Sequence, residues 1–160
     1  MQRPMRKKNR EVSQTETELL LQEGAYGVLA TAGANGQPYA TPLSYVYRGS
    51  ALYFHCAHEG LKIDNLRANP AVSFCVVGQT KVLPSQFSTE YESAVVFGNA
   101  NEVIGEEKAD ALLWLIEKYS PEFVEKGRVY IANMIEETTV VRIDITRLSG
   151  KARRKKAADA

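Results

Sequence analysis

The chain has 160 residues, 44% of them hydrophobic and 24% charged, which suits a single globular domain that needs no disulfide bonds. A formal net charge of +1 argues against a protein that neutralises nucleic acid, because that task needs many unpaired Lys and Arg side chains. No apolar run is long enough to cross a bilayer, and the basic N-terminus has no apolar segment behind it. We therefore expect a cytoplasmic protein with neither membrane nor nucleic-acid partners.

The first predicted element after a basic, solvated arm (residues 1–12) is a helix. Ser13 and Glu16 have the spacing of a capping box, and Gly24 is placed to end the helix. This pattern is typical of a helix that packs on a sheet.

A β-hairpin is predicted next. Residues 26–32 and 37–47 have strand-like composition, and Asn35-Gly36 between them is a strong hairpin signal. Pro42 lies within the second strand and cannot donate a ladder hydrogen bond. It therefore indicates an edge position, a bulge or a place where the backbone turns to another partner.

The segment that follows combines a third strand (residues 51–56) with a glycine-marked loop and a helix (61–68). A helix N-terminus offers unpaired N–H groups and a partial positive charge, which suit a phosphate. Gly60 would let the backbone approach closely, and Lys62 would add a full charge. A surface turn with a solvated lysine is the commoner meaning of such spacing.

The second half predicts three more strands and two helices. Gly98 suggests a bend at a barrel corner. The two cysteines both fall in predicted strands, and we treat them as free thiols. The predicted elements are a strand at 71–77, a loop at 78–89, a strand at 91–104, helices at 106–119 and 122–135, and a strand at 138–145. We expect one domain over residues 1–150 and a basic, flexible tail over 151–160.

The order of these elements predicts the fold class. Strands joined by turns of two to four residues are antiparallel neighbours, which does not suit a parallel α/β sheet. About six such strands favour a mainly β protein with peripheral helices, built on an antiparallel barrel that is closed or nearly closed.

Two strings in the sequence resemble a known family. They are Tyr39–Tyr47 and Leu52–Pro70, the second with the pattern His55-Cys56-Ala57-x-x-Gly60-x-Lys62. They are similar to the flavin-binding members of the pyridoxamine 5′-phosphate oxidase-like superfamily, and most similar to its nitroimidazole-resistance (Nim-type) proteins. The resemblance implies a split β-barrel and a homodimer with FMN at the subunit interface.

The resemblance also implies a role for nine residues. Lys62 and the turn at Gly60 would hold the FMN phosphate. The isoalloxazine would lie along Pro42, Leu43, Ser44 and Tyr45, and the ribityl and phosphate side would be lined by His55, Cys56 and Ala57. His55 matches the histidine linked to nitro-drug chemistry in Nim-type proteins, so it is the catalytic candidate, with a structural or ligand-contacting role as the alternative. Cys56 lies on the opposite strand face from His55, which indicates a core residue.

The main functional hypothesis is an FMN-dependent oxidoreductase that reduces a small electron-poor substrate, such as a nitroaromatic. No Gly-x-Gly-x-x-Gly fingerprint follows a strand, so NAD(P)H would bind only transiently as electron donor. No metal site is predicted.

Two alternatives remain open. The same barrel could carry or sense a flavin or a haem without turnover, with His55 or His58 as the axial ligand of the haem. The basic ends could also be nucleic-acid arms, although they lack interleaved aromatic residues.

Overall fold

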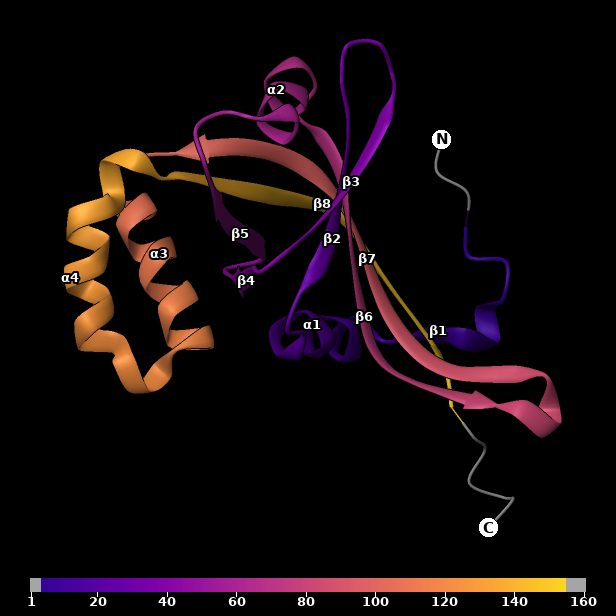
Figure 1. The fold of residues 1–160 in the computed structure, drawn as a ribbon. Coiled ribbons are helices and arrows are strands. Elements are labelled where there is room, and N and C mark those ends of the chain that lie inside the picture. Colours follow the sequence, from indigo (N-terminus) through magenta and orange to yellow (C-terminus); the bar gives the residue numbers. More distant parts are fainter. Residues whose placement is uncertain (1–3, 155–160) are drawn as a thin grey trace.

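The computed structural model describes residues 4–154, and its main feature is one strongly curved antiparallel sheet with four helices around it (Figure 1). The mainly β class predicted from the sequence is confirmed. Residues 1–3 of the predicted basic arm and 155–160 of the predicted tail lie outside the described residues.

The sheet has eight strands rather than about six. Hydrogen-bonded neighbours follow the order β3-β2-β6-β7-β8-β5-β4, and β1 pairs with the far end of β8. Every pairing is antiparallel, as short connections require. The strands are β1 (Glu11–Val12), β2 (Gly27–Ala32), β3 (Pro38–Leu43), β4 (Val46–Arg48), β5 (Ala51–Cys56), β6 (Ala71–Leu83), β7 (Ser88–Val103) and β8 (Thr139–Arg153).

The two edges of the sheet, β3 and β4, are consecutive along the chain. The strand predicted over residues 37–47 is therefore two strands, and the link between them is only Ser44-Tyr45. Within the described residues β3 and β4 do not pair, so the barrel is split by hydrogen bonding and spanned by this link alone. We call Ser44-Tyr45 the crossover.

Four helices surround the sheet: α1 (Gln14–Glu23), α2 (Leu61–Ala68), α3 (Gly105–Tyr119) and α4 (Val124–Met134). The predicted capping box is present in α1, where Ser13 accepts from Glu16 N–H and the Glu16 carboxylate accepts from Ser13 N–H. α1 ends at Gly24, and a Cβ there would lie 2.5 Å from Val76 and 2.6 Å from the Tyr45 hydroxyl. Glycine is thus needed at this helix end for close packing.

The hairpin predicted around Asn35-Gly36 is confirmed, with a longer loop than a two-residue turn. The last paired residues are Ala32 and Pro38, and Gly36 has φ +74°. Gly98 lies at a register shift between β7 and β8, and a Cβ on it would meet the Asp144 carbonyl, so the predicted bend is present as a bulge.

The loop predicted over residues 78–89 is wrong. β6 and β7 continue through this segment as a two-stranded arm that projects beyond the barrel (Figure 1). Gly78 sits at a register shift in the pairing, and Pro84 starts the 3₁₀ turn at the tip. Gly78 and Pro84 therefore lie within a β-hairpin, whereas the sequence predicted an irregular loop.

β8 is longer than predicted and reaches Arg153, so Lys151–Arg153 of the expected tail pair with β7.

The hydrophobic core has two parts because β5 is covered on both faces. Its Leu52 and Phe54 face the barrel interior, while Ala51 and Tyr53 face the α3–α4 pair. α3 packs on the sheet with Leu112 and Leu115, whereas α4 has no buried residue and packs mainly on α3. No described helix has the length and apolar character needed to cross a membrane.

Candidate functional site

The N-terminus of α2 is open to an anion. The helix begins after Gly60, whose φ of +126° favours glycine, and no side chain caps it. The first helical hydrogen bond is donated by Asp64 N–H to the Gly60 carbonyl, so the three preceding N–H groups have no partner in the helix. No atom lies within 4 Å of the place where a Cβ on Gly60 would stand. Unpaired N–H groups beside open space are what a phosphate requires.

Lys62 adds a positive charge to the first turn of α2. Its side chain is half-buried, and its ammonium lies 5.6 Å from the centre of the Phe54 ring. Within residues 4–154 it forms no ion pair, whereas Arg67, the other cation of the helix, is held by Glu102 at 3.0 Å. Lys62 is therefore the uncompensated cation of α2.

His55 and Cys56 lie on opposite faces of β5, as the strand period predicts. Cys56 packs against the barrel core, and burial raises the pKa of its thiol. His55 faces the α3–α4 side and lines a cavity there. Partial burial lowers the pKa of His55, and the nearby Lys62 charge lowers it further, so both effects favour the neutral imidazole.

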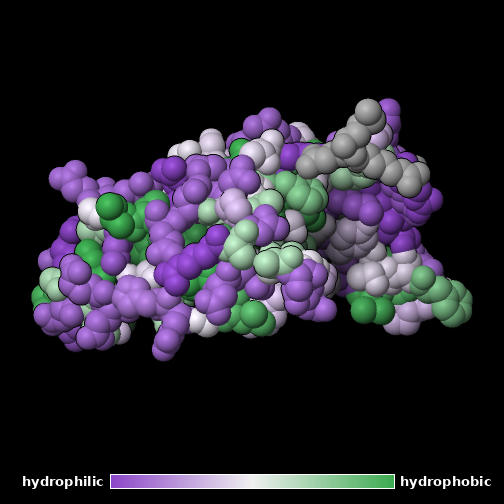
Figure 2. Space-filling view, turned by 90° about the horizontal axis from the view of Figure 1, so that it is seen from above, coloured by the Kyte–Doolittle hydropathy of each residue, from purple (hydrophilic) through white to green (hydrophobic). Residues whose placement is uncertain are grey.

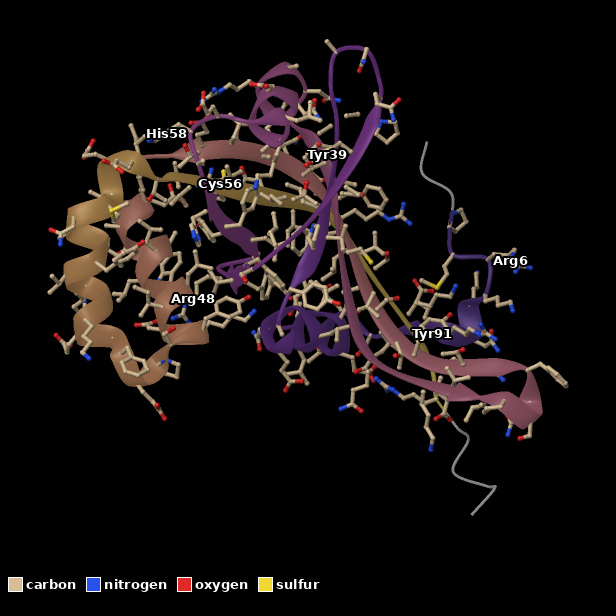
Figure 3. All side chains as sticks on the ribbon, viewed as in Figure 1. Arg6, Tyr39, Arg48, Cys56, His58 and Tyr91 are labelled. Carbon is tan, nitrogen blue, oxygen red and sulfur yellow. The ribbon has the colours of Figure 1, made fainter. Side chains whose placement is uncertain are left out.

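His58 lies in the loop between β5 and α2, and its ring contacts the segment between α4 and β8 (Figure 3). One ring nitrogen lies 2.7 Å from Thr139 Oγ1 and the other 2.8 Å from the Glu136 carbonyl oxygen. Both nitrogens are thus engaged, and His58 ties the loop before α2 to the segment between α4 and β8.

The two residues of the crossover, Ser44 and Tyr45, were both predicted to contact the isoalloxazine, but they lie in different surroundings. Tyr45 is fully buried, and its hydroxyl donates to the Leu21 carbonyl at 2.7 Å. Its main-chain N–H donates to Tyr119 Oη at 3.0 Å, and its carbonyl accepts from Lys118 Nζ at 3.0 Å. The main-chain groups of Tyr45 are therefore already bonded within the protein, whereas Ser44 lines the cavity.

The exposed edge of β3 has main-chain groups turned outward. Pro38 and Pro42 lie opposite Ala32 and Val28 in β2, and neither proline has an N–H to share with that strand. Because hydrogen-bonded pairs alternate in an antiparallel ladder, these positions and Ala40 between them direct their main-chain groups away from β2.

One inward-facing hydroxyl on β3 lacks a partner. Thr41 pairs with the fully buried Leu29, so its side chain points to the barrel interior. Its Oγ1 is buried and has no hydrogen-bond partner in the described part of the chain. A buried polar atom is normally paired, so this hydroxyl could serve a bound group.

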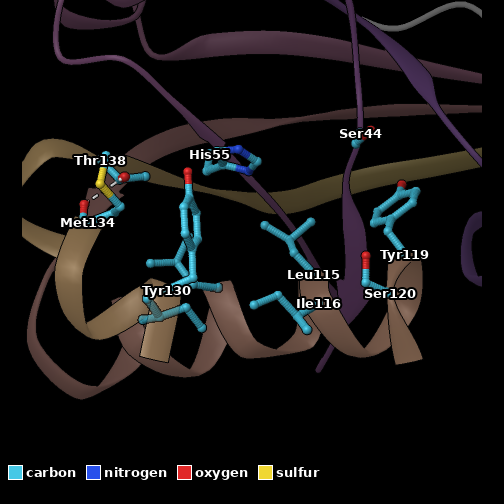
Figure 4. A pocket seen from close by; sticks show the side chains of 11 residues that line it. Ser44, His55, Leu115, Ile116, Tyr119, Ser120, Tyr130, Met134 and Thr138 are labelled. Carbon is cyan, nitrogen blue, oxygen red and sulfur yellow. Dashed lines mark hydrogen bonds between the residues drawn. The ribbon is translucent and has the colours of Figure 1, made fainter. Parts of the chain in front are cut away.

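A cavity of about 270 Å³ lies between the sheet and the α3–α4 pair (Figure 4). Ser44 and His55 form its sheet side, and the Tyr130 hydroxyl points toward His55 from α4. None of the residues that line it is acidic or carries a Lys or Arg charge. The helix side and rim are Leu112, Leu115, Ile116, Tyr119, Ser120, Tyr130, Ile131, Met134 and Thr138. Such a lining suits an uncharged, flat ring.

The nine predicted site residues thus occupy five places. Ser44 and His55 meet in the cavity, and Gly60 and Lys62 lie at the start of α2. The others are distributed between the β3 edge (Pro42, Leu43), the core (Tyr45, Cys56) and the loop after β5 (Ala57).

Sequence reasoning missed the helical wall of the cavity. The segments that form α3 and α4 were predicted only as helices, over residues 106–119 and 122–135, with no residue of theirs assigned to a site. Tyr130 and Met134 are spaced i, i+4 and so share one face of α4, which is the signal that could have indicated a common surface.

Comparisons with known proteins give the family and the fold of this chain. A family model described as pyridoxamine 5′-phosphate oxidase matches residues 13–152. A comparison with curated protein sequences found no match.

Several solved structures share the fold. A candidate 5-nitroimidazole antibiotic resistance protein from Bacteroides thetaiotaomicron has a TM-score of 0.71 and 22% identity, over 89% of this chain and 86% of that one. An FAD-binding protein from Mesorhizobium loti has a TM-score of 0.64 and 27% identity, over 91% and 98%. An FAD- and haem-binding protein from Mycobacterium smegmatis has a TM-score of 0.75 and 21% identity, over 94% and 77%.

Proposed function

The chain belongs to the pyridoxamine 5′-phosphate oxidase family, and from that premise we propose that it is a flavin-dependent oxidoreductase that binds FMN. The observation that carries the proposal is the uncapped N-terminus of α2 with the uncompensated charge of Lys62 beside it. Three unpaired N–H groups, a helix dipole and an ammonium form a complete set of ligands for a phosphate.

The polar groups near this site also fit a flavin. The outward main-chain groups of β3 at Ala40 and Pro42 match the polar edge of an isoalloxazine ring, which has both donors and acceptors. The orphan hydroxyl of Thr41 supplies one further buried donor. We assign Lys62 and the turn at Gly60 to the phosphate, and Pro42, Leu43 and Ser44 to the ring.

When bound, the flavin supplies hydride or electron transfer, and the protein supplies position, electrostatics and access. Ser44 and His55 border the cavity, and its uncharged lining would admit a small neutral, electron-poor molecule such as a nitroaromatic. The neutral His55 can accept or donate one hydrogen bond to that molecule, because its pKa is lowered.

The proposal includes a homodimer with FMN at the subunit interface. The unpaired edge of β3 and the projecting β6–β7 arm both present surface that a partner would cover, with Val82 69% and Phe87 99% exposed on the arm. Hydrophobic side chains gather at its tip, at the right of Figure 2. A two-stranded ribbon is marginally stable alone in water, so the arm gains from such a contact.

The second candidate is a carrier or sensor that binds a flavin or a haem without turnover. The observation that favours it is the chemistry of the cavity, where His55 is the one imidazole among the lining residues and an imidazole nitrogen can bind haem iron. His55 is also the histidine that faces this cavity, whereas both ring nitrogens of His58 are engaged.

Purified protein titrated with FMN, FAD and riboflavin tests the proposal through the visible spectrum. We expect a bound flavin spectrum and tighter binding of FMN than of riboflavin. A Soret band after addition of haem, with no flavin uptake, would instead support the haem carrier.

Turnover is tested by NAD(P)H oxidation with a nitroaromatic acceptor, using wild type and His55→Ala. Flavin binding without turnover from any donor would favour the carrier. A protein that takes up no flavin at all would refute the proposed function.

A further inference from the structure

The crossover lacks the interstrand hydrogen bonds that hold the rest of the barrel together. β3 and β4 are the two edges of the sheet, and within the described chain no strand pairs with Ser44 or Tyr45. The main-chain groups of this link must therefore find partners outside the ladder, because buried backbone groups are rarely left unpaired.

The C-terminus of α3 supplies these partners for Tyr45. Lys118 Nζ donates to the carbonyls of Tyr45 at 3.0 Å and Gly24 at 2.8 Å, which joins the crossover to the end of α1. Tyr119 Oη accepts from Tyr45 N–H at 3.0 Å and lies within 2.9 Å of the Tyr45 and Ala25 carbonyl oxygens, so its single proton serves one of them at a time. We call Lys118 and Tyr119 the clamp.

Within residues 4–154, the cation of the clamp, Lys118, forms no ion pair with a carboxylate. The Lys118 ammonium lies 4.1 Å from the centre of the Tyr45 ring and 5.3 Å from that of Tyr119. Glu117, the neighbouring acid on α3, pairs with Arg48 of β4 at 3.5 Å. The Tyr45 hydroxyl, which faces the same region from the crossover, stays neutral because burial raises its pKa.

These surroundings make the charge of Lys118 sensitive to pH. Burial lowers the pKa of Lys118 to about 8, from an ordinary value of 10.5. A neutral amine loses the attraction to the Tyr45 ring and donates more weakly to the two carbonyls.

The residues next to the clamp contacts also line the cavity. Ser44, which precedes Tyr45, lines the same end of the cavity as Tyr119 and Ser120, which follow Lys118 (Figure 4). A shift of the crossover therefore moves one wall of the cavity relative to His55.

We propose that Lys118 is a positioning residue whose ammonium fixes the crossover, so that Ser44 keeps its place beside the bound flavin ring and flavin affinity depends on this charge. The inference rests on the proposed function for the assignment of Ser44 to the flavin ring. The position of the crossover itself follows from its contacts with Lys118 and Tyr119.

Two measurements test the inference on the full chain. The first is hydrogen exchange of the flavin-free protein at pH 7, for wild type, Lys118→Met and Lys118→Arg. We expect Lys118→Met to speed exchange in peptides that contain residues 44–46, with β6 and β7 unchanged, and Lys118→Arg to restore most of the protection. Lys126→Met is the matched control, because Lys126 is a cation on α4 whose ammonium lies 5.6 Å from the centre of the Phe123 ring and forms no ion pair within the described residues.

The second measurement is the dissociation constant of FMN at pH 7 for the same proteins. Lys118→Met should bind FMN about fivefold more weakly than wild type, as expected of a typical coupling between sites. Lys118→Arg, which keeps the charge, should bind FMN nearly as tightly as wild type.

The outcomes separate the two proposals. Equal exchange at residues 44–46 in wild type and Lys118→Met overturns the inference, whether or not a flavin binds. Equal FMN affinity in wild type and Lys118→Met also overturns it. If no flavin binds to wild type at any pH, the proposed function fails, and faster local exchange in Lys118→Met still supports the positioning role.

Discussion

Replacement of Lys62 by methionine should weaken FMN binding and leave riboflavin binding unchanged. Lys62 stands in the first turn of α2 beside three N–H groups without helical partners, and no described carboxylate neutralises it. Methionine keeps the apolar stem that packs near Phe54 and removes only the charge. The change therefore isolates the contact of the ammonium with a phosphate.

The expected loss follows from the type of contact. One charge-assisted hydrogen bond contributes roughly 1.5–3 kcal/mol, which corresponds to about a 10- to 150-fold weaker FMN affinity. Riboflavin has no phosphate, so its affinity should be the same in both proteins. The N–H groups of α2 remain in the variant, and we therefore expect weakened rather than abolished FMN binding.

Titration calorimetry with FMN, riboflavin and FAD, on wild type and Lys62→Met, measures these differences as a thermodynamic cycle. Arg67→Met is the matched control, because Arg67 is the other cation of α2 and is already paired with Glu102. An equal loss for riboflavin, or an equal loss in Arg67→Met, would show that Lys62 does not hold the phosphate. Tighter binding of FAD than of FMN would identify FAD as the flavin.

Four further outcomes are expected. In the flavin-free protein, Lys62→Met should raise the pKa of His55 toward its ordinary value, because the Lys62 charge is one of its two depressing causes; an NMR titration with no change would contradict this electrostatic reading. Lys118 has a pKa of about 8 when folded and 10.5 when unfolded, so the unfolded state binds more protons between these values. Wild type should therefore gain up to roughly 3 kcal/mol of stability relative to Lys118→Met as pH rises from 8 to 10.5, and parallel denaturation curves across this range would refute the argument. Tyr45→Phe should lower the free energy of unfolding by about 1–3 kcal/mol in urea, since it leaves the Leu21 carbonyl without its donor; an unchanged midpoint would show that this carbonyl finds another partner. Phe87→Asp should leave the thermal midpoint almost unchanged because Phe87 is 99% exposed, yet reduce dimer formation in sedimentation; an unaffected dimer would place the interface elsewhere.

Local patterns in the sequence predicted most of the elements well. β5 and α2 have the bounds expected from the sequence, and the capping box of Ser13 and Glu16 is present. These features depend on residues that are a few positions apart, as in a capping box or the alternation of a strand. Such local interactions can be predicted from the sequence alone.

The errors have a common physical origin. The arm of β6 and β7 was predicted as a loop because Gly78 and Pro84 interrupt the pattern, although a register shift and a turn accommodate both. The division of residues 37–47 into β3 and β4 was missed because Tyr45 looks like a strand residue. Its partners, Lys118 and Tyr119, lie more than seventy residues away in the sequence.

The sequence by itself determined the family resemblance, the antiparallel barrel and the presence of Lys62 at an open helix N-terminus. Each of these depends on patterns of residues that are close together in the sequence. Only the tertiary structure decided that His55 and Ser44 share a cavity with α3 and α4, that His58 is held by Thr139, and that the crossover is clamped at Tyr45. These contacts join segments far apart along the chain. Their geometry depends on how the curved sheet brings its two edges together, which no local pattern of residues can specify.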